Sequence, residues 1–227
     1  MIMWDPTYLL LIPGLVLAML AQMKLMSTYQ RYAREKSAKG YAGAQVAQML
    51  LQAYGVRNVE IVMGTGQLTD HYDPRKRNVV LSPEVYQGTS VAAVAVAAHE
   101  TGHAIQHNEG YVPLSIRSAF APWAYYFSSL AMPLFFVGLL FGYFLATQVG
   151  IYLFMAVIVF QLVTLPVEFN ASTRAMLALA QCGIVTEEEY PWVKKMLSAA
   201  ALTYIAALTM SVLHLVRMLA ISGRRRR

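Results

Sequence analysis

The residues best suited to chemistry follow a run of alanine and valine, where His99-Glu-Thr-Gly-His103 comes directly after Val91–Ala98. Two histidines four positions apart lie on one face of an α-helix, so both imidazoles can reach one ion. His-Glu-x-x-His is the signature of zinc metallopeptidases. Its two histidines occupy two positions of a tetrahedral zinc ion, which leaves two positions for a third ligand and a water. Glu100 would lie beside the metal, where its carboxylate can accept a proton from a water attacking a peptide carbonyl.

The alternative for this motif is a helix whose histidines simply form its polar end. Seven small apolar residues, Ala92 to Ala98, precede the histidines. This favours a buried helix that presents its only polar groups at one place. Gly102 has no side chain and would let another segment pack closely against the helix. The sequence therefore predicts a zinc site on a buried helix, completed by a ligand from elsewhere in the chain.

Three other histidines could supply that ligand, each with a drawback. His107 continues the four-residue spacing, but along a straight helix it lies about 12 Å from His99, too far for one ion. It is more readily a polar residue of the helix face that helps to hold a ligand in place. His71 and His214 remain possible, although His214 lies in an apolar run where a packed, hydrogen-bonded histidine is the ordinary interpretation.

Glu168 is the preferred third ligand. It ends an apolar segment that returns, after a membrane hairpin, to the side of the membrane where the zinc helix lies. An acid at a membrane boundary is costly unless it is paired or bound to metal, so a functional role is the default interpretation. The alternative is an interfacial glutamate that pairs with Arg174.

The composition of the 227 residues predicts a membrane protein. Only 13% of them are charged, against about a quarter in a typical soluble domain, and the mean hydropathy is +0.46. The net charge of +6 comes from basic residues beside apolar segments, so anionic lipid and membrane topology explain it better than nucleic acid. The single Cys182 excludes a disulfide framework. About four apolar segments cover residues 7–26, 119–146, 151–167 and 196–221.

Charge near the first apolar segment predicts the topology. No Lys or Arg precedes Lys24 and no cleavage site follows, which indicates an uncleaved anchor that Pro13-Gly14 bends. The basic residues 24–39 place the following side in the cytoplasm and the N-terminus outside. Four spans would then put the terminal Arg224–Arg227 outside, against the same rule. Either the last segment does not cross the membrane, or the earlier basic residues dominate the orientation.

The polar residues 40–117 are predicted to form a helix, a small sheet and then the zinc helix, the order of a minimal zincin domain. The helix covers residues 41–54, the strands cover 59–63 and 78–81, and the zinc helix runs from about Thr89 to His107. A sheet edge in such a domain can hold an extended substrate by strand addition. Further on, Pro122 and Pro133 are predicted to break the second apolar segment, and Gln148 with Gly150 to mark the turn after it.

The predicted fold class is α+β and mostly helical. It combines an integral membrane helix bundle of about four apolar segments with a small zincin-like domain that carries the His-Glu-x-x-His helix. The expected domains are an N-terminal transmembrane anchor, the catalytic domain, a transmembrane hairpin that supplies the third ligand, and a polar loop and short helix followed by an apolar helix with a basic tail. They cover residues 1–26, 27–117, 118–182 and 183–227.

Two further groups could act on a substrate. Asp70-His71-Tyr72-Asp73 places acids, an imidazole and a phenol in a hairpin near the expected cleft, where His71 or Tyr72 could bind substrate or stabilise an oxyanion. The alternative is a turn with Asp73-Pro74 at its corner. Arg174 could donate to the oxyanion, or it could pair with Glu168 or with lipid phosphate.

Taken together, these motifs resemble the YugP-like family of bacterial membrane zinc metallopeptidases and, more distantly, the HtpX-type and CAAX-processing membrane proteases. The resemblance is carried by the segments Asp70–Pro74, Leu81–Tyr86, Ala97–His107 and Leu165–Ser172. It implies one zinc ion per chain held by His99, His103 and Glu168, with Glu100 as the base. Those relatives usually have an aspartate four residues after the glutamate, which orients a zinc-bound histidine. Here the position is Ser172, a weaker hydrogen-bond partner, and Asn170 is a candidate for the same task.

The sequence thus predicts a membrane-embedded zinc endopeptidase that cleaves membrane-associated proteins or peptides with a water activated by zinc and a glutamate base. It is expected to be a multi-pass protein of the inner (plasma) membrane, with the site at the cytoplasmic face and no nucleic-acid partner. It could also bind membrane-protein partners or form a homo-oligomer. The alternative function is a catalytically silent scaffold or binding subunit with a zincin fold. A transporter is disfavoured because the motif lies in the polar domain.

Overall fold

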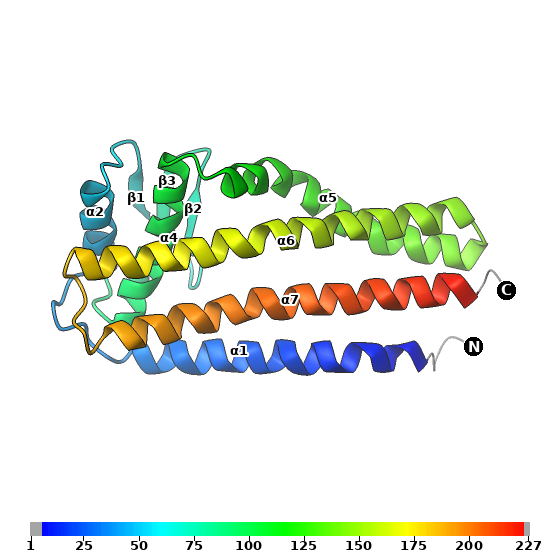
Figure 1. The fold of residues 1–227 in the computed structure, drawn as a ribbon, viewed down its shortest axis with the longest axis horizontal. Helices are drawn as coiled ribbons and strands as arrows, with labels where there is room; N and C mark the ends of the chain where they lie inside the picture. Colours follow the sequence, from blue (N-terminus) through cyan, green and yellow to red (C-terminus); the bar gives the residue numbers. More distant parts are fainter. Residues whose placement is uncertain (1–5, 225–227) are drawn as a thin grey trace. The chain divides into compact units, whose positions relative to one another are not determined.

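The computed structural model describes residues 6–224 and is mostly helical with one small sheet, which confirms the predicted fold class (Figure 1). Contacts divide the chain into two compact units. The first holds the described residues 6–22, Ile116–Leu165 and 202–224, and the second holds Met23–Ser115 and Pro166–Ala201. The four domain boundaries expected from the sequence stay predictions. In chain order the elements are η1 (Pro6–Leu11), α1 (Ile12–Tyr32), α2 (Gly43–Ala53), β1 (Glu60–Met63), β2 (His71–Asp73), β3 (Asn78–Leu81), α3 (Pro83–Tyr86), α4 (Val91–Asn108), α5 (Val112–Phe141), α6 (Phe144–Gln181) and α7 (Tyr190–Arg224).

The second unit is built around α4, the helix that carries the His-Glu-x-x-His motif. The helix begins after Ser90, whose hydroxyl accepts a hydrogen bond from the backbone N–H of Ala93 at 3.2 Å. Its alanines and valines are buried except for the partly buried Val96, and they pack on one side against α2, α6 and α7 and on another against β3. A helix that is apolar all round belongs in a core, so the buried helix predicted from the alanine run is confirmed.

The sheet has the strand order β1-β3-β2, with β3 parallel to β1 and antiparallel to β2. Two of the strands match the predicted runs at 59–63 and 78–81, and Gly55 follows α2 with a φ of +66°, a conformation that favours glycine. β2 and β3 form a hairpin that pairs Tyr72 with Val79. The segment 71–73 is therefore a strand that leads into a turn after Asp73. The action of His71 or Tyr72 on a substrate stays a prediction.

Four helices in the described part of the chain are long and apolar enough to cross a membrane, as the composition predicted. They cover Pro6–Tyr32, Val112–Phe141, Phe144–Gln181 and Tyr190–Gly223. Small residues let these helices approach closely within the first unit. A Cβ on Gly14 of α1 would lie 2.8 Å from the Leu213 side chain of α7, and one on Gly150 of α6 would lie 2.7 Å from the Ala131 carbonyl of α5.

The turn after the second span was predicted at the wrong place. It lies at Gly142, whose φ of +74° suits glycine, while Gln148 and Gly150 lie inside α6. Gly150 serves close helix packing instead of a turn. A glycine in a membrane span has both uses, and the sequence pattern does not distinguish them.

The prolines break fewer helices than predicted. Pro122 and Pro133 lie inside the continuous helix α5, because membrane helices tolerate proline when neighbouring groups satisfy the freed carbonyls. Pro13 lies in the first turn of α1, directly after η1, where no N–H is needed, and the bend expected there stays a prediction.

The last apolar run also begins earlier than predicted, because α7 is one helix from Tyr190 and not a short helix followed by a separate span. Thr186 and Glu189 exchange hydrogen bonds ahead of it, as a capping pair does. Most of the arginine tail, Arg225–Arg227, lies outside the described residues.

Candidate metal centre

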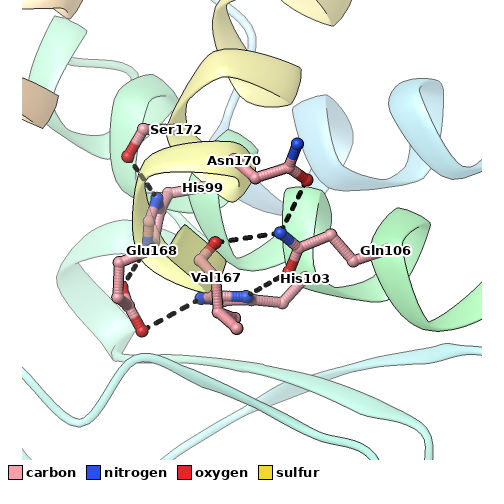
Figure 2. Close-up of polar contacts among 7 residues, drawn as sticks. All are labelled: His99, His103, Gln106, Val167, Glu168, Asn170 and Ser172. Atoms are coloured by element: carbon pink, nitrogen blue, oxygen red, sulfur yellow. Dashed lines mark hydrogen bonds and ion pairs between the residues drawn. The ribbon is translucent and has the colours of Figure 1, made fainter. Parts of the chain in front are cut away.

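Three side chains from two helices meet in the second unit (Figure 2). His99 and His103 lie one turn apart on α4, with ring centroids 4.9 Å apart, and Glu168 lies on α6. The Glu168 carboxylate is 3.2 Å from His99 Nε2 through Oε2 and 3.7 Å from His103 Nε2 through Oε1. Ligand atoms of all three residues lie within 4.8 Å of one another. The group is well shielded from solvent, since Glu168 is only 3% exposed.

Gly102 explains how α6 comes so close to the motif. A Cβ at this position would lie 2.6 Å from the backbone carbonyl of Ala171, so any side chain would push the two helices apart. Ala171 is three residues after Glu168 on α6. The close packing predicted at Gly102 is therefore present, and it brings the helix with the carboxylate against the helix with the imidazoles.

Gln106 fixes how the imidazole of His103 is protonated. The amide nitrogen of Gln106 donates to the backbone carbonyl of Val167 at 2.9 Å, which can only accept, so the Gln106 orientation is set (Figure 2). Its amide oxygen faces His103 Nδ1 at 3.0 Å. Because an amide oxygen also only accepts, Nδ1 must carry the ring hydrogen. The neutral His103 ring then turns the Nε2 lone pair toward the Glu168 carboxylate.

His99 is held by a different partner. The hydroxyl of Ser172 lies 3.1 Å from His99 Nδ1, four residues along α6 from Glu168. Ser172, which the resemblance pointed to, thus contacts this histidine. A hydroxyl can donate or accept, so Ser172 does not impose one tautomer on His99 as Gln106 does on His103.

The donor set fits a zinc ion. Two imidazole nitrogens and one carboxylate are common ligands of catalytic zinc, and ligands of a tetrahedral ion at about 2.0–2.2 Å lie about 3.4 Å apart. The two nitrogen–oxygen separations, 3.2 and 3.7 Å, lie on either side of that value. A lone pair of His103 Nε2 facing a carboxylate oxygen is an arrangement of two acceptors, which a cation between them would satisfy.

Glu100 is half-buried at the motif, on the turn that carries His99. Among residues 6–224, none donates a hydrogen bond to its carboxylate or forms an ion pair with it. It therefore keeps its acceptor capacity, as a general base requires.

Asn170 and Arg174 extend the contacts of Gln106 away from the three candidate ligands. Gln106 donates to Asn170 Oδ1 at 2.8 Å, and Arg174 Nε donates to the same oxygen at 2.6 Å. A second guanidinium nitrogen of Arg174 forms an ion pair with Glu109. The pairing of Arg174 with Glu168 weighed above is therefore replaced by pairing with Glu109. Asn170 supports His103 through Gln106, not by direct contact.

The remaining histidines lie elsewhere. His107 Nδ1 is 2.7 Å from the Tyr72 hydroxyl, which joins two of the predicted site residues to each other. His71 is exposed, and its Nδ1 contacts the Thr69 carbonyl at 2.7 Å. His214 belongs to the first unit and packs edge-on against Phe154. The three histidines are thus not part of the metal-ligand group formed by His99, His103 and Glu168.

Gln106 is the residue that the sequence analysis missed. A signal was present, because Gln106 stands three positions after His103 and so on the same helix face. It is fully buried, and a buried amide needs partners for both its nitrogen and its oxygen. His107 was considered instead, because it continues the four-residue spacing of the motif.

A buried His-Glu-x-x-His helix that meets a glutamate from a helix long and apolar enough to cross a membrane defines the class, a membrane protein with a candidate zinc centre. Residues 7–223 match the family described as "Putative neutral zinc metallopeptidase", and the chain belongs to this family. It is 43% identical over 217 residues to the "Putative membrane protease YugP" of Bacillus subtilis (strain 168), a match that covers 95% of this chain and 96% of that protein. No solved structure matches the chain. The resemblance drawn from the motifs is confirmed.

Proposed function

We propose that the chain is a zinc endopeptidase that hydrolyses peptide bonds of membrane-associated proteins or peptides. The observation that carries this proposal is the meeting of His99, His103 and Glu168 in one shielded group, with Glu100 directly after His99 in the chain. Zinc in such a site supplies a Lewis acid that lowers the pKa of a water to about 7. His99, His103 and Glu168 would hold the ion. The descriptions of the family and of the relative support a peptidase activity.

The Glu100 carboxylate would act as the general base and then as the general acid. It accepts the proton of the water as the oxygen attacks the scissile carbonyl, and it then passes that proton to the leaving amine. Its position suits both steps, because Glu100 is half-buried and so can meet water, and because it follows His99 on the same turn of α4. The buried Gln106 and the half-buried Ser172 would keep the two imidazoles in the orientation that binds metal.

Removing the metal is the first test. The purified protein in a neutral detergent should cleave a quenched fluorescent peptide, lose this activity when treated with a zinc chelator, and recover it when zinc is restored. Recovery with zinc separates loss of the metal from irreversible unfolding. Cleavage that continues after the metal has been removed and measured as absent would contradict the proposal.

Replacing Gln106 with leucine tests the orientation of His103. The change removes the acceptor at His103 Nδ1, and we expect zinc affinity to fall about 10- to 100-fold, the usual effect of losing a hydrogen bond to a zinc ligand. Affinity would be measured by competition with a chromophoric chelator. The control is Thr101→Val, which changes another buried polar residue of α4 that bonds only to the Ala97 carbonyl. An equal loss of affinity in both variants would show that helix packing, and not His103, is responsible.

The site is proposed to lie at the cytoplasmic face of a multi-pass protein of the inner (plasma) membrane. The basic residues 24–39 belong to the same compact unit as the three candidate ligands. By the positive-inside rule, these residues favour the cytoplasmic side for that unit. Membrane-protein partners and a homo-oligomer stay predictions.

A further inference from the structure

A polar cavity of about 350 Å³ lies at the C-terminal turn of α4. None of the candidate metal ligands lines it. Three segments contribute to it: the loop after α2, the β2–β3 hairpin and the end of α4. Its polar side chains are Arg57, Asn58, Tyr72, Arg77, His107 and Asn108. The wall thus contains two guanidinium groups, an imidazole, a phenol and two amides, and none of the lining residues is acidic.

The two arginines of this cavity keep their charge uncompensated. In the described part of the chain, neither Arg57 nor Arg77 has a carboxylate within 4.0 Å. Burial lowers the pKa of His107, and the charge of Arg77 lowers it further. The charge that acts on His107 is thus that of Arg77, whereas Tyr72 in the same wall also feels the negative charge of Asp73.

The contact between Tyr72 and His107 adds a hydrogen-bond donor to the wall. Burial raises the pKa of Tyr72 to about 12, so its hydroxyl keeps the proton at neutral pH. The hydroxyl can then donate to Nδ1 of the neutral His107 ring, which lies 2.7 Å away. In that arrangement Nε2 carries the ring hydrogen, and His107 offers an N–H as the guanidinium and amide groups do.

The negative end of the α4 helix dipole is too weak to neutralise the charges of Arg57 and Arg77. A helix C-terminus is equivalent to about half a negative charge, whereas Arg57 and Arg77 supply two positive ones. The last carbonyls of the helix are already satisfied, because Ile105, Gln106 and His107 accept hydrogen bonds from the backbone N–H groups of residues 109–111. The end of α4 therefore does not neutralise the two guanidinium groups.

The backbone at Arg77 is also unusual. Its φ of +54° lies in the left-handed region that favours glycine, yet the position carries a long cationic side chain that lines the cavity. Strain of this kind is common where a side chain serves a binding site. Arg75, in the same turn, does not line the cavity.

We propose that this cavity binds a phosphate group, either as free phosphate or as the phosphodiester of an anionic lipid headgroup. Guanidinium groups match phosphate oxygens in pairs, and a phosphate has more acceptor oxygens than a carboxylate for donors that converge from three segments. The bound group would lie near His107, one helical turn and about 6 Å along the helix axis from His103. The proposal does not depend on peptidase activity.

The test uses the whole protein in a neutral maltoside detergent, titrated with inorganic phosphate in one arm and with soluble dihexanoyl phosphatidylglycerol in the other. Calorimetry would give the dissociation constant of each probe. The test variant is the double change Arg57→Gln with Arg77→Gly. Glycine suits the backbone at position 77, so this variant removes the charge without adding strain. We expect its dissociation constant to rise at least tenfold.

The matched control is Arg57→Gln with Arg75→Gly, which loses the same net charge but keeps Arg77. It should bind the probe more tightly than the test variant. Binding in the first arm identifies free phosphate as a ligand, and binding only in the second identifies the lipid headgroup; both support the proposal. The proposal would be overturned if neither probe bound, or if the test and control variants weakened binding equally. It would also be overturned if succinate, a dicarboxylate without phosphate, bound in place of phosphate.

Discussion

Replacing Glu100 with glutamine should abolish peptide cleavage and leave zinc in place. Glutamine keeps the shape of the side chain but cannot accept a proton at neutral pH, and general-base catalysis contributes about 10²- to 10⁴-fold to a rate. We therefore expect kcat to fall at least about 100-fold. Zinc content should stay at one ion per chain, because Glu100 is not one of the three residues whose ligand atoms meet. Cleavage of a fluorescent peptide and metal analysis of the same preparation measure both effects.

A matched control for this variant is Glu187→Gln, an identical change at an exposed glutamate of the same compact unit. It should keep both zinc and activity. The Glu100 variant also separates the peptidase from the silent scaffold. A scaffold would keep its cellular role in the variant, whereas an enzyme would lose it. Full cleavage by the Glu100 variant would show that another group takes the proton.

Replacing Glu168 with alanine should remove most of the bound zinc. Loss of a group that only supports a ligand weakens zinc binding about 10- to 100-fold, so loss of a ligand itself should weaken it by more than about 100-fold. His99 and His103 would remain on α4 without the carboxylate that now faces both rings. Chelator competition gives the affinity, and cleavage should fall in proportion to zinc occupancy.

Glu189 provides the comparison for that experiment. It is as buried as Glu168, and its two oxygens accept hydrogen bonds from the backbone N–H groups of Ala38 and Thr186. Glu189→Ala should therefore lower the melting temperature while zinc affinity stays unchanged. Equal loss of zinc in the two variants would mean that a buried carboxylate supports the fold in both cases and that the third ligand is another residue.

The part of the fold nearest the motif could be predicted because its chemistry is local. An alanine-rich run before His99 has few ways to be stable other than burial, and an acid at the end of an apolar segment, such as Glu168, needs a partner. These two requirements indicate which residues should meet. The close approach at Gly102 follows from the same logic, since a glycine in a buried helix allows backbone contact.

The errors fall where one residue type has two uses. Gly150 was predicted to turn the chain and instead allows α5 and α6 to pack, whereas Gly142 makes the turn. Pro122 and Pro133 were predicted to break a helix that continues through them. In each case the outcome depends on neighbouring helices, which a single sequence does not specify.

The hydrogen bond that orients His103 could not be predicted for a related reason. Gln106 acts through its amide geometry, which is set by the backbone carbonyl of Val167 on another helix. The sequence shows a glutamine at helical spacing from a histidine but not what fixes its orientation. Ser172 was identified only because relatives carry an aspartate at that position, and the structure adds its contact with His99.

The most direct measurement is zinc K-edge X-ray absorption of the Glu100→Gln protein, which should hold metal without turning over substrate. Two imidazoles and one carboxylate predict a first coordination sphere of nitrogen and oxygen only, at about 2.0–2.2 Å, with the multiple-scattering signature of two histidine rings. A sulfur ligand at about 2.3 Å, or the signature of a single ring, would contradict the site formed by His99, His103 and Glu168.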